Sequence, residues 1–369
     1  MGNRSTNTNR DANITVDGHL ANFFNSNFVT RLVGTNMSGN TPIVATGGVK
    51  TTPGNGYIYH VFCTGGPGPA TGQTFVKTAG TNAAIEILLV GGGGGGGGGL
   101  EAGGGGGAGG VAYGTGLKLD NGTYPMEIAA GGTKGPFNGA TSGDGGNSSF
   151  NAGAVMPGEF GNFIAYGGGG GGGQQTPTAP DEQPGRPGGS GGGGSGVDGD
   201  PNASSGGTAS MPTSTPVNPT TYFNVYGNDG GGTTTGTGDI GSGGGGAGGA
   251  GGSITSGPVV GGKGGISIAI PAFPGPIVGP HPLISNDTAT AIGPTGRYGE
   301  GGSGGSNVPG GATDPMPSHG GGRGSTPTQA GTFGLDNGGG GGGGGNGVGY
   351  GSQGGGYGLV AIRYLEQEP

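Results

Sequence analysis

The chain has 369 residues, of which 112 are glycine, and its formal net charge at pH 7 is −8. A glycine share near one third is typical of collagen, but here the glycines stand in blocks such as 91–99, and only 27 residues are proline. The small net charge also argues against a chain kept unfolded by charge repulsion. Because hydrophobic residues make up only 28% of the chain, something other than side-chain burial must order much of it.

Basic residues are few and scattered, with 12 Lys and Arg against 20 Asp and Glu. Nucleic acids and anionic membranes require clustered positive charge, so neither is an expected partner. No apolar run approaches the ~20 residues of a membrane-spanning helix, and residues 1–17 are polar, so we expect assembly in a cytosol and no membrane insertion. Cys63 is the single cysteine, which excludes an internal disulfide and predicts a small buried residue.

Residues 1–50 are rich in Asn and Thr, contain no long glycine block, and are expected to form a separate attachment or oligomerisation module. From residue 57 onward, short runs of β-branched and aromatic residues bounded by Gly, Pro and Asn predict strands. No segment has helical periodicity over three turns, so we expect essentially no α-helix. The predicted strands are 57–62, 74–77, 85–90, 124–128, 163–166 and 359–364.

Glycine-dominated tracts separate these strands. One interpretation is flexible linker, but the tracts contain little Ser and most are not flanked by domain-sized segments. The alternative is polyglycine II, a left-handed helix with three residues per turn and no internal hydrogen bonds, whose backbone groups must therefore bond to neighbouring helices. The tracts are 91–99, 103–110, 167–173, 191–194, 243–252 and 338–345.

The fold class that we predict is an all-β cap joined to a polyglycine-II helix bundle. Residues 51–166 would form the β cap with the first glycine helices, and residues 167–369 the bundle with its distal loops and closing C-terminal strand. If the tracts run alternately away from the cap and back, residues 174–190 and 253–337 lie at the distal end and residues 195–242 near the cap. Shorter glycine clusters at 261–265, 299–305 and 320–324 could add helices, and an odd number of them would break this alternation.

Several segments resemble a known family. The run Ile85–Val90 leading into polyglycine, the segments 109–111, 122–124 and 148–150, and the final run 358–364 are similar to the glycine-rich domain of bacteriophage tail-fibre and other virion appendage proteins. A looser likeness is to the polyglycine-sandwich tip adhesins of T-even-like phages. The resemblance covers about residues 51–364.

This resemblance implies a virion protein, on the tail or capsid surface, whose distal loops bind a host-surface glycan or outer-membrane protein. It also implies a homotrimer, although the sequence contains no coiled coil. Residues 1–50 lie outside the resemblance, and we expect them to attach the protein to other virion proteins.

Loops in which aromatic and polar residues alternate suit glycan or outer-membrane surfaces. Phe273 stands among prolines and could instead pack only against its own loop, and the aromatic residues of 222–226 are expected to pack near the cap. The predicted receptor-binding residues, all in the expected distal loops, are Gln174, Gln175, Arg186, Phe273, His281 and Tyr298.

The sequence contains no catalytic signature, so we expect neither an enzyme nor a cofactor. Segment 261–264 reads Gly-Gly-Lys-Gly and lacks the hydroxyl residue of a phosphate-binding loop. Asp198, Asp200 and Asn202 have the spacing of the first half of a calcium loop. Ala203 then replaces the glycine that such a loop needs, so a polar turn is the preferred interpretation and no metal site is predicted.

Two other classes of function remain open. The first is a structural virion protein without a receptor, such as a capsid decoration or fibre subunit. The second is an ice-binding or matrix protein, which would need a flat, regular face with few loops, and the long connection 253–337 argues against it.

Overall fold

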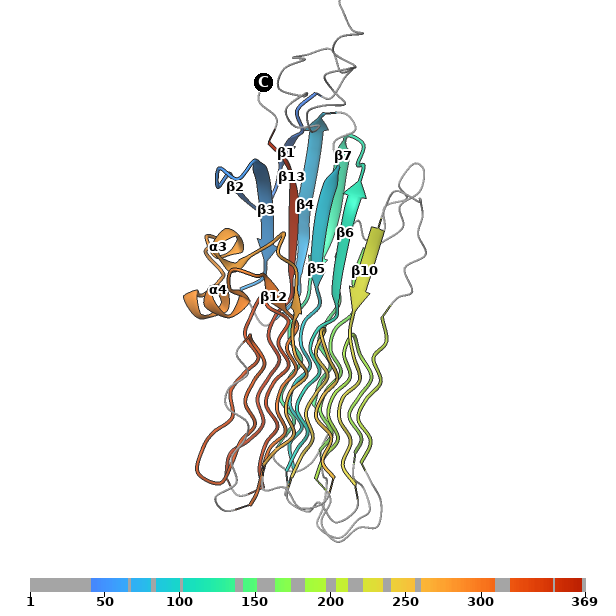
Figure 1. Ribbon diagram of the computed structural model, residues 1–369, viewed down its shortest axis with the longest axis vertical. Coiled ribbons are helices and arrows are strands. Elements are labelled where there is room, and N and C mark those ends of the chain that lie inside the picture. Colours follow the sequence, from blue (N-terminus) through green and yellow to red (C-terminus); the bar gives the residue numbers. More distant parts are fainter. Residues whose placement is uncertain are drawn as a thin grey trace, which may run out of the picture.

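The computed structural model has its β-strands at one end and long glycine-rich segments that run from them to the other end (Figure 1). Most strands therefore lie in one part of the molecule, as the order of strands and glycine tracts in the sequence predicts. The structure describes residues 41–65, 68–80, 84–99, 102–136, 142–150, 163–173, 183–196, 204–211, 222–234, 240–255, 260–308, 319–347 and 349–366.

A six-stranded antiparallel sheet contains the strongest strand signals of the sequence. Its order is β10-β6-β5-β13-β3-β2, so the C-terminal strand β13 lies between β5 and β3. Its members are β2 (Val49–Thr51), β3 (Tyr57–Cys63), β5 (Ile85–Val90), β6 (Val111–Leu117), β10 (Tyr222–Tyr226) and β13 (Leu359–Leu365).

A five-stranded antiparallel sheet of order β1-β4-β7-β8-β9 packs against the first. Its members are β1 (Val44–Thr46), β4 (Ala70–Ala79), β7 (Gly122–Ile128), β8 (Ser148–Phe150) and β9 (Phe163–Ala165). The predicted strands are thus confirmed, and the all-β class with them. Because β1 and β2 belong to the two sheets, residues 44–51 are part of the β region, whereas residues 1–40 of the predicted N-terminal module lie outside the described residues.

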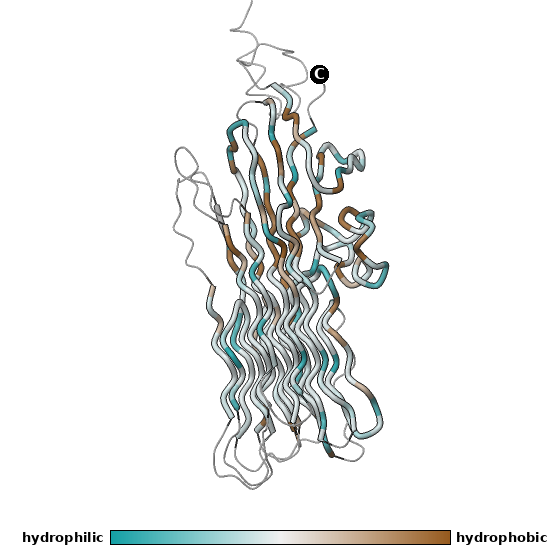
Figure 2. The backbone as a smooth tube through the Cα atoms, turned by 180° about the vertical axis from the view of Figure 1, so that it is seen from behind, coloured by the Kyte–Doolittle hydropathy of each residue, from teal (hydrophilic) through white to brown (hydrophobic). Residues whose placement is uncertain are grey.

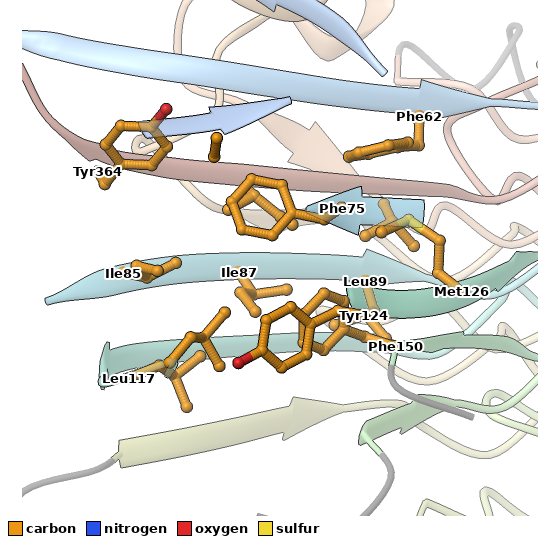
Figure 3. Close-up of a cluster of buried hydrophobic side chains, with 14 of the residues drawn as sticks. Phe62, Phe75, Ile85, Ile87, Leu89, Leu117, Tyr124, Met126, Phe150 and Tyr364 are labelled. Carbon is orange, nitrogen blue, oxygen red and sulfur yellow. The ribbon is translucent and has the colours of Figure 1, made fainter. Parts of the chain in front are cut away.

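Alternating side chains of the central strands supply two hydrophobic clusters, one on each face of the six-stranded sheet. On β5, Ile85, Ile87 and Leu89 point between the two sheets, whereas Leu88 and Val90 point to the opposite face. A strand buried on both faces requires a nearly continuous apolar run, which explains the sequence of β5. Figure 3 shows the cluster between the sheets, where the rings of Tyr124 and Phe150 stack with their centroids 5.6 Å apart.

The second cluster lies under a small insertion that contains β11 (Ile268–Ala269), α3 (Gly275–Val278), α4 (Asn286–Ile292) and β12 (Arg297–Tyr298). The side chain of Ser285 caps α4 by accepting a hydrogen bond from Thr288 N, as a serine at a helix start commonly does. These two short helices lie beside the six-stranded sheet (Figure 1). The prediction that 253–337 is a distal loop is therefore wrong for this insertion.

The glycine-rich segments lie side by side below the sheets and are called the glycine array from here on. Figure 2 shows that strongly hydrophobic residues concentrate in the sheets and the insertion, whereas the array is mostly pale. The described parts of the array are 91–99, 102–110, 129–136, 142–147, 166–173, 183–196, 204–211, 227–234, 240–255, 260–266, 299–308, 319–336, 339–347 and 349–358.

The simple alternation of the predicted tracts fails because more segments cross the array than the pure glycine blocks indicate. Segment 183–189, which contains Pro184 and Arg186, runs toward the sheets, although it was expected in a distal loop. Within the predicted tract 243–252 the chain reverses, since Gly246 N donates to Gly249 O. The three shorter glycine clusters, by contrast, do add segments to the array, as the sequence suggested.

Candidate functional site

Segment 91–99 lies in the interior of the glycine array and bonds to neighbours on every side. Residues three apart donate to the same neighbour, since the N–H groups of Gly91, Gly94 and Gly97 bond to carbonyls of 104–110 at 2.8 or 2.9 Å. In the same way, the N–H groups of 92 and 95 donate to carbonyls of 143–146, and those of 93 and 96 donate to carbonyls of 353–356. Each residue therefore points about a third of a turn away from the previous one. The carbonyls of this segment accept from 132–135, 168–171 and 342–345.

The close approach of these segments requires glycine. A Cβ at Gly93 would stand 1.9 Å from the carbonyl oxygen of Gly340, and one at Gly96 would stand 2.0 Å from that of Gly343. These are backbone atoms already held by their own hydrogen bonds, so they cannot move aside. The glycines are buried and hydrogen-bonded, which is the opposite of a solvated flexible linker.

Buried hydroxyl groups replace glycine near the end of the array that is remote from the sheets. Ser142 Oγ lies 2.6 Å from Gly95 O and 3.1 Å from Gly171 O, and donates its proton to these carbonyls. Ser242 and Ser352 also donate to backbone carbonyls of neighbouring segments. These side chains thus add a donor to carbonyls, most of which also accept a hydrogen bond from a backbone N–H group.

Several rim segments of the array carry exposed side chains at intervals of three residues. Segments in the interior have almost none, so this spacing places the side chains on the outward face only. Arg186 and Asp144, on two rim segments, form an ion pair with 2.7 Å between Nη2 and Oδ2. Rim pairs with this spacing are Asp144 and Asn147, Ser205 and Thr208, and Lys263 and Ile266.

A polar cluster on the outer face of the six-stranded sheet fixes the insertion to it. Arg363 binds the Glu86 carboxylate at 2.8 and 2.9 Å, and its guanidinium lies 4.2 Å from the ring centroid of Tyr57. The hydroxyl of Tyr113 also donates to Glu86, and burial together with this bond raises the pKa of Tyr113. Since Arg363 Nη1 donates to Ala272 O at 3.2 Å, the cluster joins sheet and insertion.

The sequence model of the glycine-rich domain family matches residues 69–365 of this chain. The chain belongs to the glycine-rich domain family. The matched part begins just before β4 and ends with β13, so it includes the array and most of both sheets. No curated protein matches the chain.

The predicted receptor-binding residues lie in different parts of this glycine-rich domain. Arg186 is on the rim of the array, half-exposed and paired with Asp144, rather than in a distal loop. Gln174 and Gln175 lie outside the described residues. The structure therefore does not bring Arg186 together with the other described candidates as one surface.

Phe273, His281 and Tyr298 are buried in the insertion next to the sheets, so their predicted distal position is wrong. Phe273 meets the rings of Tyr59 and Tyr113 edge to face, with centroids 6.0 and 6.3 Å apart. Tyr298 donates its hydroxyl proton to Phe273 O at 2.6 Å. Phe273 thus has a packing role, which was the alternative to receptor binding. It packs against the sheet as well as within its own loop.

Metal-binding and membrane-spanning features were also expected to be absent. The weak calcium candidates Asp198, Asp200 and Asn202 lie outside the described residues. In the part of the chain that the structure describes, no three His, Cys, Asp or Glu side chains come together as a possible metal site. Among those same residues, no helix is both long enough and apolar enough to cross a bilayer.

Sequence reasoning missed a set of exposed aromatic side chains on the rim. Phe333 is 63% exposed and Tyr350 is 39% exposed, and Tyr357 is partly exposed. Aromatic residues in glycine-rich sequence, next to the last glycine tract, are the signal that could have drawn attention to them. Their relation to one another depends on how the segments pack, which the sequence does not show.

Proposed function

We propose that this glycine-rich domain protein is a bacteriophage virion appendage protein, a tail fibre or tip adhesin, that binds a host-surface receptor. Its binding loops are held on a polyglycine-II bundle, and it acts without catalysis. The observation that supports this proposal best is a side-chain-poor array, tied together by hydrogen bonds, in which the described residues reverse direction at 326–329 and 346–350, away from the sheets. Loops on a rigid scaffold are a common arrangement for recognition.

The polyglycine-II part of the proposal rests on the three-residue period of the hydrogen bonds of 91–99 and on the lack of space for any Cβ there. With a rise of ~3.1 Å per residue, nine residues extend roughly 28 Å. Ordering glycine costs ~0.5–1 kcal/mol more than ordering alanine, so the bonds between segments must offset this cost.

The two ends of the molecule support different roles. The strand β1 and the end of β13 lie at the sheet end, opposite the remote end of the array (Figure 1). Attachment to other virion proteins through residues 1–50 would leave the remote end free to meet a host glycan or outer-membrane protein. We further propose assembly in the host cytoplasm and a homotrimer, both in keeping with the resemblance to tail-fibre proteins.

The receptor role is tested by adding the purified protein to susceptible bacterial cells. Saturable binding to the cells and a dose-dependent block of infection are expected. Protein that does not bind at saturating concentration would contradict the receptor role and favour a structural virion subunit.

The architecture is tested separately by amide hydrogen exchange. Slow exchange is expected for the glycines of 91–97, because their N–H groups are buried and bonded. Exchange at the rate of an unstructured peptide would restore the flexible-linker interpretation.

A further inference from the structure

One rim of the array is formed by segments 330–336 and 351–358, which run side by side in the same direction. Gly334 N donates to Gly354 O at 3.0 Å, which fixes their relative register. Phe333, next to this bond, is among the most exposed large hydrophobic side chains of the described residues, at 63%. This rim therefore presents an aromatic ring to solvent on a backbone that hydrogen bonds hold in place.

The three-residue period determines which side chains share a face of 351–358. Gly355 and Gly358 donate to one neighbouring segment, at Gly132 and Ala129, so residues three apart point the same way. Gly351, Gly354 and Tyr357 consequently share another face.

Phe333 Cδ1 lies 3.5 Å from the point where a Cβ of Gly354 would stand, so its ring covers that face. Tyr357 leaves the same face three residues further on, ~9 Å along the segment. In the other direction, the position of a Cβ on Gly351 has no neighbouring atom within 4 Å. Two rings thus follow one another along an open, glycine-lined strip.

A carboxylate that can accept hydrogen bonds lies directly beside Tyr357. Asp336 is exposed, and its Oδ1 accepts a hydrogen bond from Tyr357 N at 3.3 Å, which holds the carboxylate next to Tyr357. A carboxylate accepts more than one hydrogen bond, so Asp336 can also accept from a ligand hydroxyl. Arg323, on an adjoining segment, directs Nη2 to Ala330 O at 2.8 Å.

We infer that the strip formed by Phe333, Tyr357 and Asp336 binds a neutral oligosaccharide of a host-surface glycan. This inference rests on the proposed receptor-binding function and assigns it a ligand class and a site. Rings ~9 Å apart can each cover the apolar C–H face of one sugar, and the carboxylate accepts from sugar hydroxyls. The negative charge of Asp336 opposes phosphate and acidic sugars. Separated rings also do not form the contiguous apolar patch that marks many protein-protein interfaces.

The probe is a printed panel of neutral oligosaccharides built from glucose, galactose and N-acetylglucosamine. The oligosaccharide that binds most tightly is then titrated against the protein. Phe333→Ala and Tyr357→Ala should each weaken binding roughly two- to tenfold, as the loss of one aromatic contact does. Tyr357→Phe should retain binding, because the ring remains. Ile266→Ala is the matched control, since Ile266 is similarly exposed, at 62%, on another rim segment. Thermal unfolding of each variant verifies that the fold is intact.

If the wild-type protein binds none of the printed oligosaccharides, the inference is overturned. Variants that bind as tightly as the wild type would also overturn it. Whole-cell binding separates this inference from the proposed function. If wild-type protein binds cells and the double variant Phe333→Ala, Tyr357→Ala binds them equally well, the strip is not the contact, but the receptor function stands. If the wild type binds the oligosaccharide and not cells, the strip stands and the receptor function falls.

Discussion

The two regions of the molecule are both closely packed, by opposite means. In the sheets, large side chains such as those of Ile87 and Phe150 fill the space between backbones and are fully buried. In the glycine array the backbones themselves touch, and hydrogen bonds to neighbouring segments on every side replace hydrophobic contact. A core therefore requires closely fitting atoms with satisfied hydrogen bonds, and side chains are only one way to supply them.

The largest effect is expected from adding a side chain to the interior of the array. Gly93→Val should cost more than about 5 kcal/mol, the whole stability of many domains, because the new Cβ would overlap the carbonyl of Gly340. Urea denaturation followed by circular dichroism measures this loss. Gly351→Ala is the control, since its Cβ enters open space and stability should stay within about 0.5 kcal/mol. Similar stability of the two variants would contradict the tight packing of the array.

In the sheets, removing a large side chain should destabilise the protein. Phe150→Ala removes a fully buried ring that stacks on Tyr124, and such deletions cost about 3–5 kcal/mol. The midpoint of urea unfolding, compared with that of Phe150→Leu, reports the loss. A cost below about 1 kcal/mol would show that this cluster does not hold the sheets together.

Buried hydroxyl groups of the array offer a finer comparison. Ser142→Ala should cost about 0.5–1.5 kcal/mol, because the carbonyls of Gly95 and Gly171 lose the hydroxyl donor and keep only their backbone donors. Ser190→Ala is a matched control: its hydroxyl is also fully buried but has no hydrogen-bond partner, so its removal should be neutral or stabilising. Equal costs for the two variants, measured by thermal unfolding, would contradict this role of Ser142.

Acidification should weaken the β region through His60. Burial lowers the pKa of His60, although its hydrogen bond to Gly47 O raises it, and the charge of Lys50 lowers it further. Above about pH 7 the side chain is neutral in both states, so stability is constant there. Below about pH 6.5 the unfolded chain binds more protons at His60 than the folded chain does, so stability falls as the pH falls toward the lowered pKa of the folded state. Unfolding midpoints at these pH values should fall less steeply in His60→Gln, and parallel slopes would show that other groups are responsible.

The smallest effect is expected at the rim of the array. Arg186→Ala removes the ion pair with Asp144, but the two side chains are 46% and 35% exposed. Solvent screens such pairs, so the loss should be about 0–1 kcal/mol and smaller in high salt. A double-mutant cycle with Asp144→Ala measures the pair alone, and a coupling above about 2 kcal/mol would mean that the rim is held together by charge.

An element of this fold could be predicted from the sequence only where its own residues carry a recognisable pattern. Strand β5 was found because burial on both faces leaves a continuous apolar run, but β6 contains Gly114 and Gly116 and has a weak strand pattern. Helix α4 has only seven residues, too few for helical periodicity to be recognised. Local sequence therefore reveals the strongest strands and little of the insertion.

The array and its surface depend on non-local contacts. Rim segments such as 183–189 need glycine only where they face a neighbour, so Pro184 and Arg186 concealed them from a search for glycine blocks. In the same way, Phe333 and Tyr357 lie along one strip only because their segments pack in one particular register. The order in which segments neighbour one another is absent from composition, and the alternation of tracts was wrong for that reason.

The central place of β13 has a consequence for how the chain acquires its fold on the ribosome. Among the described strands β13 is the last to be synthesised, yet it pairs with both β5 and β3. Segment 91–99 likewise bonds to 353–356 as well as to residues nearer in sequence. Until residue 365 has emerged, β5 and β3 each lack a partner along one edge, and unpaired edges invite pairing with other chains. We expect nascent chains that stop before residue 359 to aggregate or require a chaperone, whereas full-length chains should close the sheet at once.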